Sequence, residues 1–160
     1  MFTIYVYILD TLADWELGYV TSELHSGRFF KKDAPRVSLQ TVSASTKPIR
    51  TMGGMTVVPD CLVDDIVLSN TSILLLPGAN TWNDKKHQAI LNKACSLLSL
   101  GGTVCAICGA TGALLFAKQI ISHLGVFRAD TLKYWYQYFG TGDPQYYFAL
   151  MQTLSSGHED

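Results

Sequence analysis

The sequence Thr103-Val-Cys-Ala-Ile-Cys-Gly-Ala-Thr-Gly-Ala-Leu114 decides how this chain folds. Its first half is a short apolar run after Gly101-Gly102, which predicts a β-strand. Its second half consists of small and apolar residues with helical spacing that continues to Lys118. A strand that turns sharply into a helix leaves one side chain exposed at the end of a sheet, which is the geometry of a nucleophile elbow. We expect Cys108 to be that residue.

The elbow position predicts the chemical character of Cys108. The free N–H groups of the first helical turn face such a residue, and the helix dipole favours negative charge there. Both effects favour the thiolate, which is the reactive form of cysteine. We therefore predict a nucleophile or an oxidation-sensitive thiol. The alternative interpretation is a small buried core residue.

Strand-like and helix-like segments alternate along the chain. Apolar runs predict strands at 2–9, 37–42, 55–58, 72–77 and 103–107. Helices are expected at 15–26, 84–100, from the elbow to about 124, at 130–139 and at 144–154, with a hairpin or irregular crossing at 43–54 and a short helix or turn at 59–65. This alternation predicts a flavodoxin-like (Rossmann-like) α/β fold, in which a doubly wound, mostly parallel sheet has helices on both faces.

Composition limits the class of protein. The chain has 160 residues, of which 48% are hydrophobic and 16% charged, so we expect one globular domain at 1–154 and a flexible tail at 155–160. A net charge of -1 without a basic cluster argues against nucleic acid, and the strand-length apolar runs argue against a membrane. The N-terminus lacks the basic region of a signal peptide, and the four cysteines match free thiols in a reducing cytoplasm.

Three loops should meet at the carboxyl edge of the predicted sheet. They are Asp10–Glu16, Pro77–Trp82 and Cys108–Gly112, each of which follows a predicted strand. In doubly wound folds this edge binds the ligand. We therefore expect the functional site there, with a small molecule as its substrate.

The motifs in these loops resemble the ThiJ/PfpI family of the class I glutamine amidotransferase-like superfamily, which includes a deglycase and intracellular proteases. The matching segments are Asp14-Trp-Glu16, Leu75-Leu-Pro-Gly-Ala79, Ala106–Gly112 and Phe127–Trp135. The resemblance covers nearly the whole chain. It implies an elbow cysteine, a glutamate whose carboxyl group contacts the sulfur, and a backbone oxyanion hole.

These implied roles fall on four residues, each of which has a structural alternative. Glu16 would need burial to raise its pKa, so that it donates a proton to the thiolate. Alternatively, it is a solvated glutamate in the first turn of a helix. The N–H groups of Ala79 and Gly109 would hold an oxyanion beside Cys108. Alternatively, Pro77-Gly78 merely ends a strand.

The chain departs from the family pattern in two places. Ala79 stands where the family usually has a second glycine, and a left-handed backbone there would be strained by the Cβ atom. In addition, Gly109–Leu114 runs straight into Leu115–Ile120, which resembles a later helix of the family. Several dozen family residues, including a histidine near the cysteine, have no counterpart. Either the chain has lost them or the sequence given omits them.

Other reactive side chains have weaker signals. Cys105 and Cys108 have the spacing of a redox pair or half a zinc site, but three residues along a strand place two sulfurs on opposite faces. We therefore predict neither a metal nor a cofactor. Among the histidines, His87 on the long helix is the first to check. An aromatic cluster follows at 134–139 and 146–148. It would cap the core or form a subunit interface, and we predict a homodimer.

The sequence leaves two functions open. The first is a cysteine hydrolase, glyoxalase, deglycase or amidotransferase-like enzyme, in which Cys108 attacks a small carbonyl or amide substrate. The second is a non-catalytic redox-sensing or chaperone-like stress protein. In that case Cys108 would oxidise to a sulfinate that Glu16 stabilises. An amidotransferase with a synthase partner is disfavoured, because no Cys-His-Glu triad is evident late in the chain.

Overall fold

Residues 2–116 are the part of the chain that the computed structural model describes. The helices expected at 117–124, 130–139 and 144–154 and the tail at 155–160 lie outside these residues. The aromatic cluster and His123 lie outside them as well. The single domain at 1–154 therefore stays a prediction.

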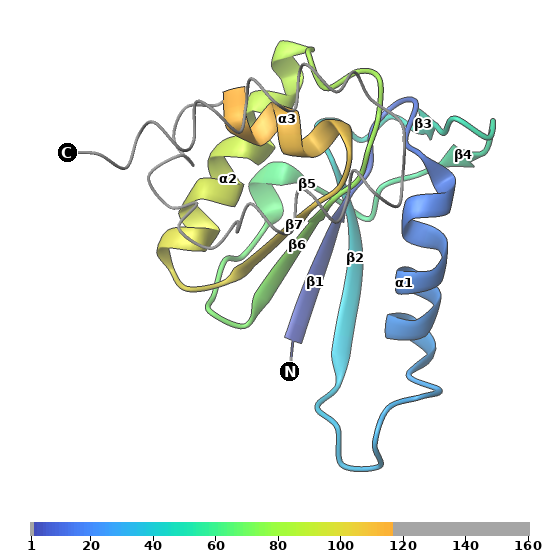
Figure 1. The fold of residues 1–160 in the computed structure, drawn as a ribbon, viewed down its shortest axis with the longest axis vertical. Helices are drawn as coiled ribbons and strands as arrows, with labels where there is room; N and C mark the ends of the chain where they lie inside the picture. The colour runs from blue at the N-terminus through green and yellow to red at the C-terminus, as the bar shows by residue number, and fades with distance from the viewer. Residues whose placement is uncertain (1, 117–160) are drawn as a thin grey trace, which may run out of the picture. The chain divides into compact units, whose positions relative to one another are not determined.

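The described residues form a five-stranded parallel sheet in the order β5-β2-β1-β6-β7 (Figure 1). Its strands are β1 (Phe2–Tyr7), β2 (Val37–Ser43), β5 (Cys61–Leu62), β6 (Ser72–Leu76) and β7 (Thr103–Ala106). The chain moves from β1 to β2 on one side and later to β6 and β7 on the other. The point where the direction reverses lies between β1 and β6, and ligands bind at such a point in doubly wound sheets. The predicted flavodoxin-like fold is confirmed.

Two crossover helices cover the sheet. α1 (Asp14–Ser26) connects β1 to β2, and α2 (Gln88–Ser99) follows β6 and leads to β7. Crossovers between parallel strands are right-handed as a rule, and these two run in opposite directions across the sheet. α1 and α2 accordingly lie on opposite faces (Figure 1). α3 (Gly109–Phe116) begins directly after β7. None of the helices in the described chain has the length and apolar character needed to cross a membrane.

The core lies on both sides of the central strands. Successive side chains of a strand point to opposite faces, so a strand covered by helices on both faces is apolar throughout. β1 follows this pattern, since every residue from Ile4 to Leu9 is at most 5% exposed. The largest fully buried side chains around it include Tyr7, Ile4, Leu74, Leu76, Ile90 and Leu97.

Two local predictions are confirmed only in part. The strand expected at 55–58 is only β4 (Thr56–Val57), which pairs antiparallel with β3 (Ile49–Arg50) outside the main sheet. The segment expected to be a helix or turn at 59–65 begins with β5, and a 3₁₀ turn at Val63–Asp65 (η1) follows. Asp60 explains the added strand, because its Oδ2 accepts the Thr41 N–H at 2.7 Å and its own N–H donates to the Thr41 carbonyl oxygen at 2.9 Å. These bonds hold the segment against β2. The spacing of apolar residues in the sequence cannot predict such an interaction.

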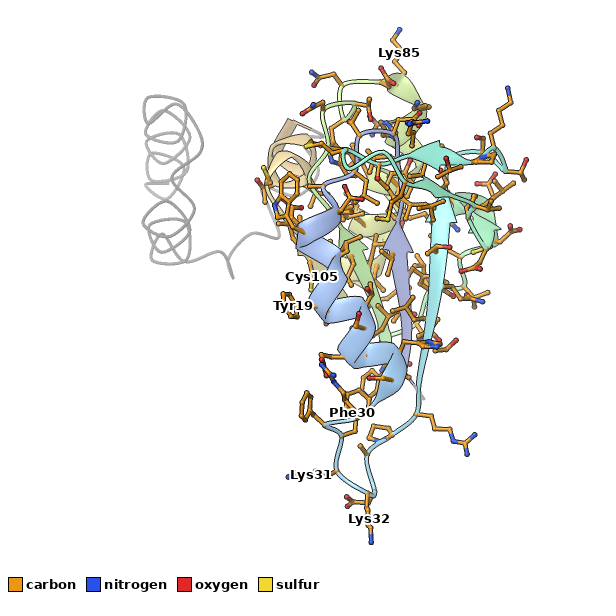
Figure 2. All side chains as sticks on the ribbon, turned by 90° about the vertical axis from the view of Figure 1, so that its right-hand side faces the viewer. Tyr19, Phe30, Lys31, Lys32, Lys85 and Cys105 are labelled. Atoms are coloured by element: carbon orange, nitrogen blue, oxygen red, sulfur yellow. The ribbon has the colours of Figure 1, made fainter. Side chains whose placement is uncertain are left out.

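The long helix expected at 84–100 is divided. One 3₁₀ turn at Lys85–His87 (η2) precedes α2, so His87 lies just before the α-helix. Lys85 marks this turn in Figure 2. Four apolar residues of α2 are buried, namely Ile90, Leu91, Ala94 and Leu97.

Gly102 lies where α2 packs beside β7, and Gly18 lies at an exposed position of α1. Substituting each in turn tests how tightly α2 and β7 pack. A Cβ atom at Gly102 would lie 2.2 Å from Cδ1 of the fully buried Leu97. We expect Gly102→Ala to lower the free energy of unfolding by about 1–3 kcal/mol through overpacking. Gly18, inside α1, has nothing within 4 Å of the same position. As the matched variant, Gly18→Ala should raise the free energy of unfolding by about 0.5–1 kcal/mol. Urea unfolding followed by circular dichroism measures both, and equal effects would contradict the packing.

Candidate active site

Cys108 occupies the turn between β7 and α3, as the sequence predicts. Its φ angle is 49°, a left-handed backbone that is uncommon for a residue with a Cβ atom. The Ile107 N–H donates to the Leu76 carbonyl oxygen at 2.9 Å, and the Thr111 hydroxyl donates to the Cys108 carbonyl oxygen at 2.6 Å. These bonds hold the strained turn from both sides, and the Cys108 side chain is exposed. The geometry is that of a nucleophile elbow.

Glu16 and Cys108 approach the same point beside Gly78. The Gly78 N–H donates to Oε2 of Glu16 at 2.5 Å. A Cβ atom on Gly78 would lie 2.7 Å from Oε1 of Glu16 and 2.9 Å from Cβ of Cys108. Any side chain at position 78 would therefore force the glutamate and the cysteine apart. In residues 2–116 no hydrogen bond joins the Cys108 sulfur to Glu16, so their direct contact stays a prediction.

The position of Glu16 favours its neutral form. Partial burial raises the pKa of the carboxyl group, and the hydrogen bond from the Gly78 N–H opposes that rise only in part. The sequence analysis expected this direction, because a glutamate that serves as a proton donor must hold its proton near neutral pH. Glu16 lies in the first turn of α1 and reaches across to the end of β6.

Ala79 and Gly109 bring the second and third loops together. If Gly109 had a Cβ atom, that atom would lie 3.0 Å from the carbonyl oxygen and 3.7 Å from the nitrogen of Ala79. Within the described residues neither the Ala79 N–H nor the Gly109 N–H has an acceptor. Both groups are therefore available for a ligand. Ala79 is not among the residues with positive φ, so the strain considered for its Cβ atom does not arise.

Behind this loop lies a buried aromatic cluster that the sequence analysis missed. It consists of Tyr7, Trp82 and His87, whose ring centroids are 5.4–5.7 Å apart. The indole N–H of Trp82 donates to the Pro77 carbonyl oxygen at 2.9 Å, and the Tyr7 hydroxyl shares a 2.7 Å hydrogen bond with Nδ1 of His87. No periodic pattern marks Trp82, because it lies in a turn rather than in a helix or a strand.

His87 therefore supports the loop instead of reaching the sulfur. It is 1% exposed, and burial, together with the adjacent Lys86, lowers its pKa. The neutral imidazole packs against Trp82, whose Cδ1 would contact a Cβ atom at Gly109 at 3.4 Å. His87, the first candidate among the histidines, therefore packs against Trp82 and bonds to the Tyr7 hydroxyl group.

Asp14 and Trp15, the two residues before Glu16, neither cap nor pack the start of α1. The N-cap residue of α1 is Ala13, with no side-chain cap. Asp14 instead accepts the Gly53 N–H at 2.6 Å, and the Thr51 hydroxyl and this N–H lower its pKa. Trp15 is 67% exposed. Both residues follow a turn held by backbone bonds to other loops, and such long-range bonds leave no local sequence signal.

The remaining cysteines are less accessible than Cys108. All four cysteines are free, and burial raises the pKa values of Cys61, Cys95 and Cys105. Only Cys108 is exposed. Cys105 lies within β7 and is half-buried, whereas Cys108 lies in the turn after that strand and is exposed.

The fold and this elbow define an α/β protein with an exposed cysteine at the carboxyl edge of its sheet. A sequence model of the DJ-1/PfpI family matches residues 2–126. The chain belongs to this family, and the resemblance found in its motifs is confirmed.

Two relatives show how much of the family the chain retains. It is 32% identical to a protein named "Uncharacterized protease YoaZ" from Bacillus subtilis (strain 168), over 204 positions that cover 95% of this chain and 97% of the relative. Because this alignment is longer than the 160-residue chain, the relative has internal residues with no counterpart here. The crystal structure of a thiJ/pfpI family protein from Bacillus anthracis is 44% identical, with a TM-score of 0.68 over 71% of this chain.

The chain spans 55% of the length of that Bacillus anthracis protein. A DJ-1 superfamily protein from Agrobacterium tumefaciens shares the fold at 22% identity and a TM-score of 0.61, over 74% of this chain and 59% of that protein. Activity, substrate and partners are therefore matters for proposal.

The raised pKa of Glu16 makes stability depend on pH. A carboxyl group that holds its proton more tightly in the folded state weakens folding as pH rises from its ordinary value of 4.5 through the folded value. Glu16→Gln removes this ionisation. The variant should gain thermal stability relative to wild type at pH 7.5, and the gain should shrink at pH 4. Thermal unfolding at the two pH values measures this difference, and a gain that is independent of pH would be inconsistent with a buried carboxyl group.

The left-handed backbone at Cys108 predicts an unusual order of stability. Glycine adopts positive φ without a Cβ clash, so Cys108→Gly should be about 1 kcal/mol more stable than Cys108→Ala. Cys105, in the adjacent strand, provides the matched pair. There Cys105→Gly should be less stable than Cys105→Ala, because glycine weakens a strand. Chemical denaturation measures all four variants, and the same order at both positions would argue against the strained elbow.

Proposed function

We propose that this chain is a cysteine-dependent enzyme of the DJ-1/PfpI type that acts on a small carbonyl or amide substrate. Cys108 would be the nucleophile, Glu16 the proton carrier, and the N–H groups of Ala79 and Gly109 the oxyanion hole. The approach of Glu16 and Cys108 to one point beside Gly78 is the observation that carries the proposal. Glu16 and Cys108 are distant in the sequence, yet they meet where not even the Cβ atom of an alanine would fit. So close an approach of an acid and a thiol favours a functional role for the pair.

The proposed step is the addition of the thiol to a carbonyl group. The Cys108 thiolate forms a bond to the carbonyl carbon, and the electron pair of the C=O bond moves to the oxygen. The two N–H groups donate to that oxygen while its charge develops. Neutral Glu16 then gives it a proton, and the proton released by the thiol restores Glu16. The product is a hemithioacetal, and no atom leaves.

An aldehyde substrate fits these groups better than an amide. Hydrolysis of an amide also needs a proton for the leaving amine and a base for the attacking water. The histidines in residues 2–116 are His25, at the end of α1, and His87, buried behind Trp82. After addition to a 2-oxoaldehyde, Glu16 would carry a proton from C1 to C2 of the hemithioacetal to give a thioester, and water would release the hydroxy acid and restore the thiol. This sequence has no leaving amine to protonate. We therefore favour 2-oxoaldehydes and glycated adducts over peptides.

One observation supports a second function. Cys108 is exposed, and its position at the start of α3 favours an anion. Two equivalents of peroxide would convert the thiol to a sulfinate and release two molecules of water. The neutral carboxyl group of Glu16 would donate a hydrogen bond to the sulfinate. Such a chain would be a redox-sensing or chaperone-like stress protein.

The homodimer and the cytoplasmic location remain proposals as well. Trp15 and Tyr19 on α1 are 67% and 84% exposed, and aromatic residues are enriched at subunit interfaces. Figure 2 shows Tyr19 on the outer side of α1. Free thiols suit a reducing compartment.

Turnover of methylglyoxal separates the two functions. We expect Cys108→Ser to reduce the rate by about 1,000-fold or more, as loss of a nucleophile does in other enzymes. Glu16→Gln should reduce it by about 100-fold through loss of proton transfer. Cys105→Ser is the matched control and should retain the rate. Absence of turnover with both methylglyoxal and an amide, together with addition of two oxygen atoms at Cys108 by dilute peroxide, would reject the enzyme and support the sensor.

A further inference from the structure

Thr11 has a backbone conformation that its side chain disfavours. Its φ angle is 64°, and β-branched residues are true outliers in the left-handed region. In the described residues only Cys108 shares this feature among those with a Cβ atom. Strain of this kind persists where the surrounding structure imposes it, and it gathers at functional sites. The position of Thr11 in the first loop of the site therefore requires an explanation.

Hydrogen bonds on two sides impose the conformation. The Thr11 N–H donates to the Arg50 carbonyl oxygen at 2.8 Å, and the Met52 N–H donates to the Leu12 carbonyl oxygen at 2.9 Å. These bonds fix the turn to the end of β3 and to the loop after it. On its other side the turn contacts the loop that follows β6, and these contacts bear on the site.

Three hydrogen bonds connect the turn to the loop around Ala79. The Ala13 N–H donates to the Gly78 carbonyl oxygen at 2.9 Å, and the Asn80 N–H donates to Oγ1 of Thr11 at 2.8 Å. The Thr81 hydroxyl donates to the Asp10 carbonyl oxygen at 2.8 Å. The bonded residues surround Ala79, whose own N–H has no acceptor in the described chain.

The geometry of the peptide bond shows which way the N–H and carbonyl groups of Ala79 point. Peptide bonds in the described chain are trans, so a carbonyl oxygen and the following N–H point in opposite directions. Because the Gly78 carbonyl points to Ala13, the Ala79 N–H points away from the turn. Because the Asn80 N–H points to Thr11, the Ala79 carbonyl points away as well, and it lies 3.0 Å from where a Cβ atom on Gly109 would be.

We infer that Thr11 is a positioning residue, whose strained backbone directs its hydroxyl oxygen to the Asn80 N–H and so fixes the peptide after Ala79. The Ala13–Gly78 bond fixes the peptide before it, and together the two bonds keep residue 79 in the conformation in which its N–H points away from the turn and can receive an anion. The inference rests on the proposed function, since it explains how the oxyanion hole keeps its geometry. It assigns the hole a support on the β1–α1 turn. A variant that loses this oxygen frees the peptide between Ala79 and Asn80 to rotate.

Alkylation of Cys108 tests the inference without relying on turnover. Iodoacetate carries a carboxylate that the Ala79 and Gly109 N–H groups can bind, whereas iodoacetamide is neutral. The measured quantity is the ratio of the two alkylation rates at Cys108, followed by peptide mass spectrometry. In the folded wild type this ratio should exceed the ratio in urea.

We expect Thr11→Ala to lower the ratio about fivefold, the factor that the net free energy of one hydrogen bond predicts. Thr11→Ser keeps the oxygen and should retain the ratio. Thr11→Gly removes the oxygen but relieves the strained φ angle, so it should lower the ratio even if Thr11→Ala folds poorly. Thr21→Ala is the matched control, because the Thr21 hydroxyl also bonds a backbone group, the Leu17 carbonyl within α1 at 2.8 Å.

The outcomes distinguish this inference from the proposed function. Equal ratios in wild type, Thr11→Ala and Thr11→Gly would overturn the role of Thr11, whether or not the enzyme turns over. A ratio that falls in both variants and recovers in Thr11→Ser supports it. If that pattern appears in a protein that does not consume methylglyoxal, the proposed enzyme is rejected and the role of Thr11 in anion binding stands. Where turnover occurs, Thr11→Ala should lower kcat more than it raises KM.

Discussion

The site depends on a missing atom. Gly78 has no Cβ, and the space where that atom would stand brings the carboxyl group of Glu16 and the Cβ of Cys108 together. The N–H of the same glycine donates to Glu16 and fixes the carboxyl group there. Burial at this point raises the pKa of Glu16, so one close approach brings the proposed pair together and shifts the acid toward its protonated form. Any larger residue at position 78 would remove both properties.

The topology of the sheet provides that approach. β1 lies in the centre, β6 lies beside it, and β7 follows β6, so the three loops after these strands emerge side by side. The opposite directions of the two crossovers leave α1 on one face and α2 on the other. The loop after β6 is then fixed from two sides, by the turn after β1 and by the buried pair of Trp82 and His87. The Ala79 N–H, which has no acceptor among residues 2–116, therefore lies in a rigid frame.

The sequence revealed the parts of this arrangement that local patterns encode. Apolar runs marked every long strand, the elbow marked Cys108, and the motif after the first strand marked Glu16. Long-range hydrogen bonds were beyond its reach. β5 forms because Asp60 bonds to Thr41, and Asp14 binds Gly53 instead of capping its helix. Trp82 and Thr11 lie in turns, where apolar residues have no regular spacing that could mark them. Their roles arise from partners that are distant in the sequence and close only in the folded chain.

The parallel pairing of the central strands also governs when the site can form. Thr3 lies opposite Ser72, and Leu74 lies opposite Val104, so the sheet depends on contacts between residues far apart in the chain. Such non-local pairing is slow to form, because closing a long loop costs chain entropy before the strand contacts can stabilise it. The thiol and the acid meet only after both pairings are in place. A newly made chain therefore assembles the proposed site of Cys108 and Glu16 only after the sheet is complete.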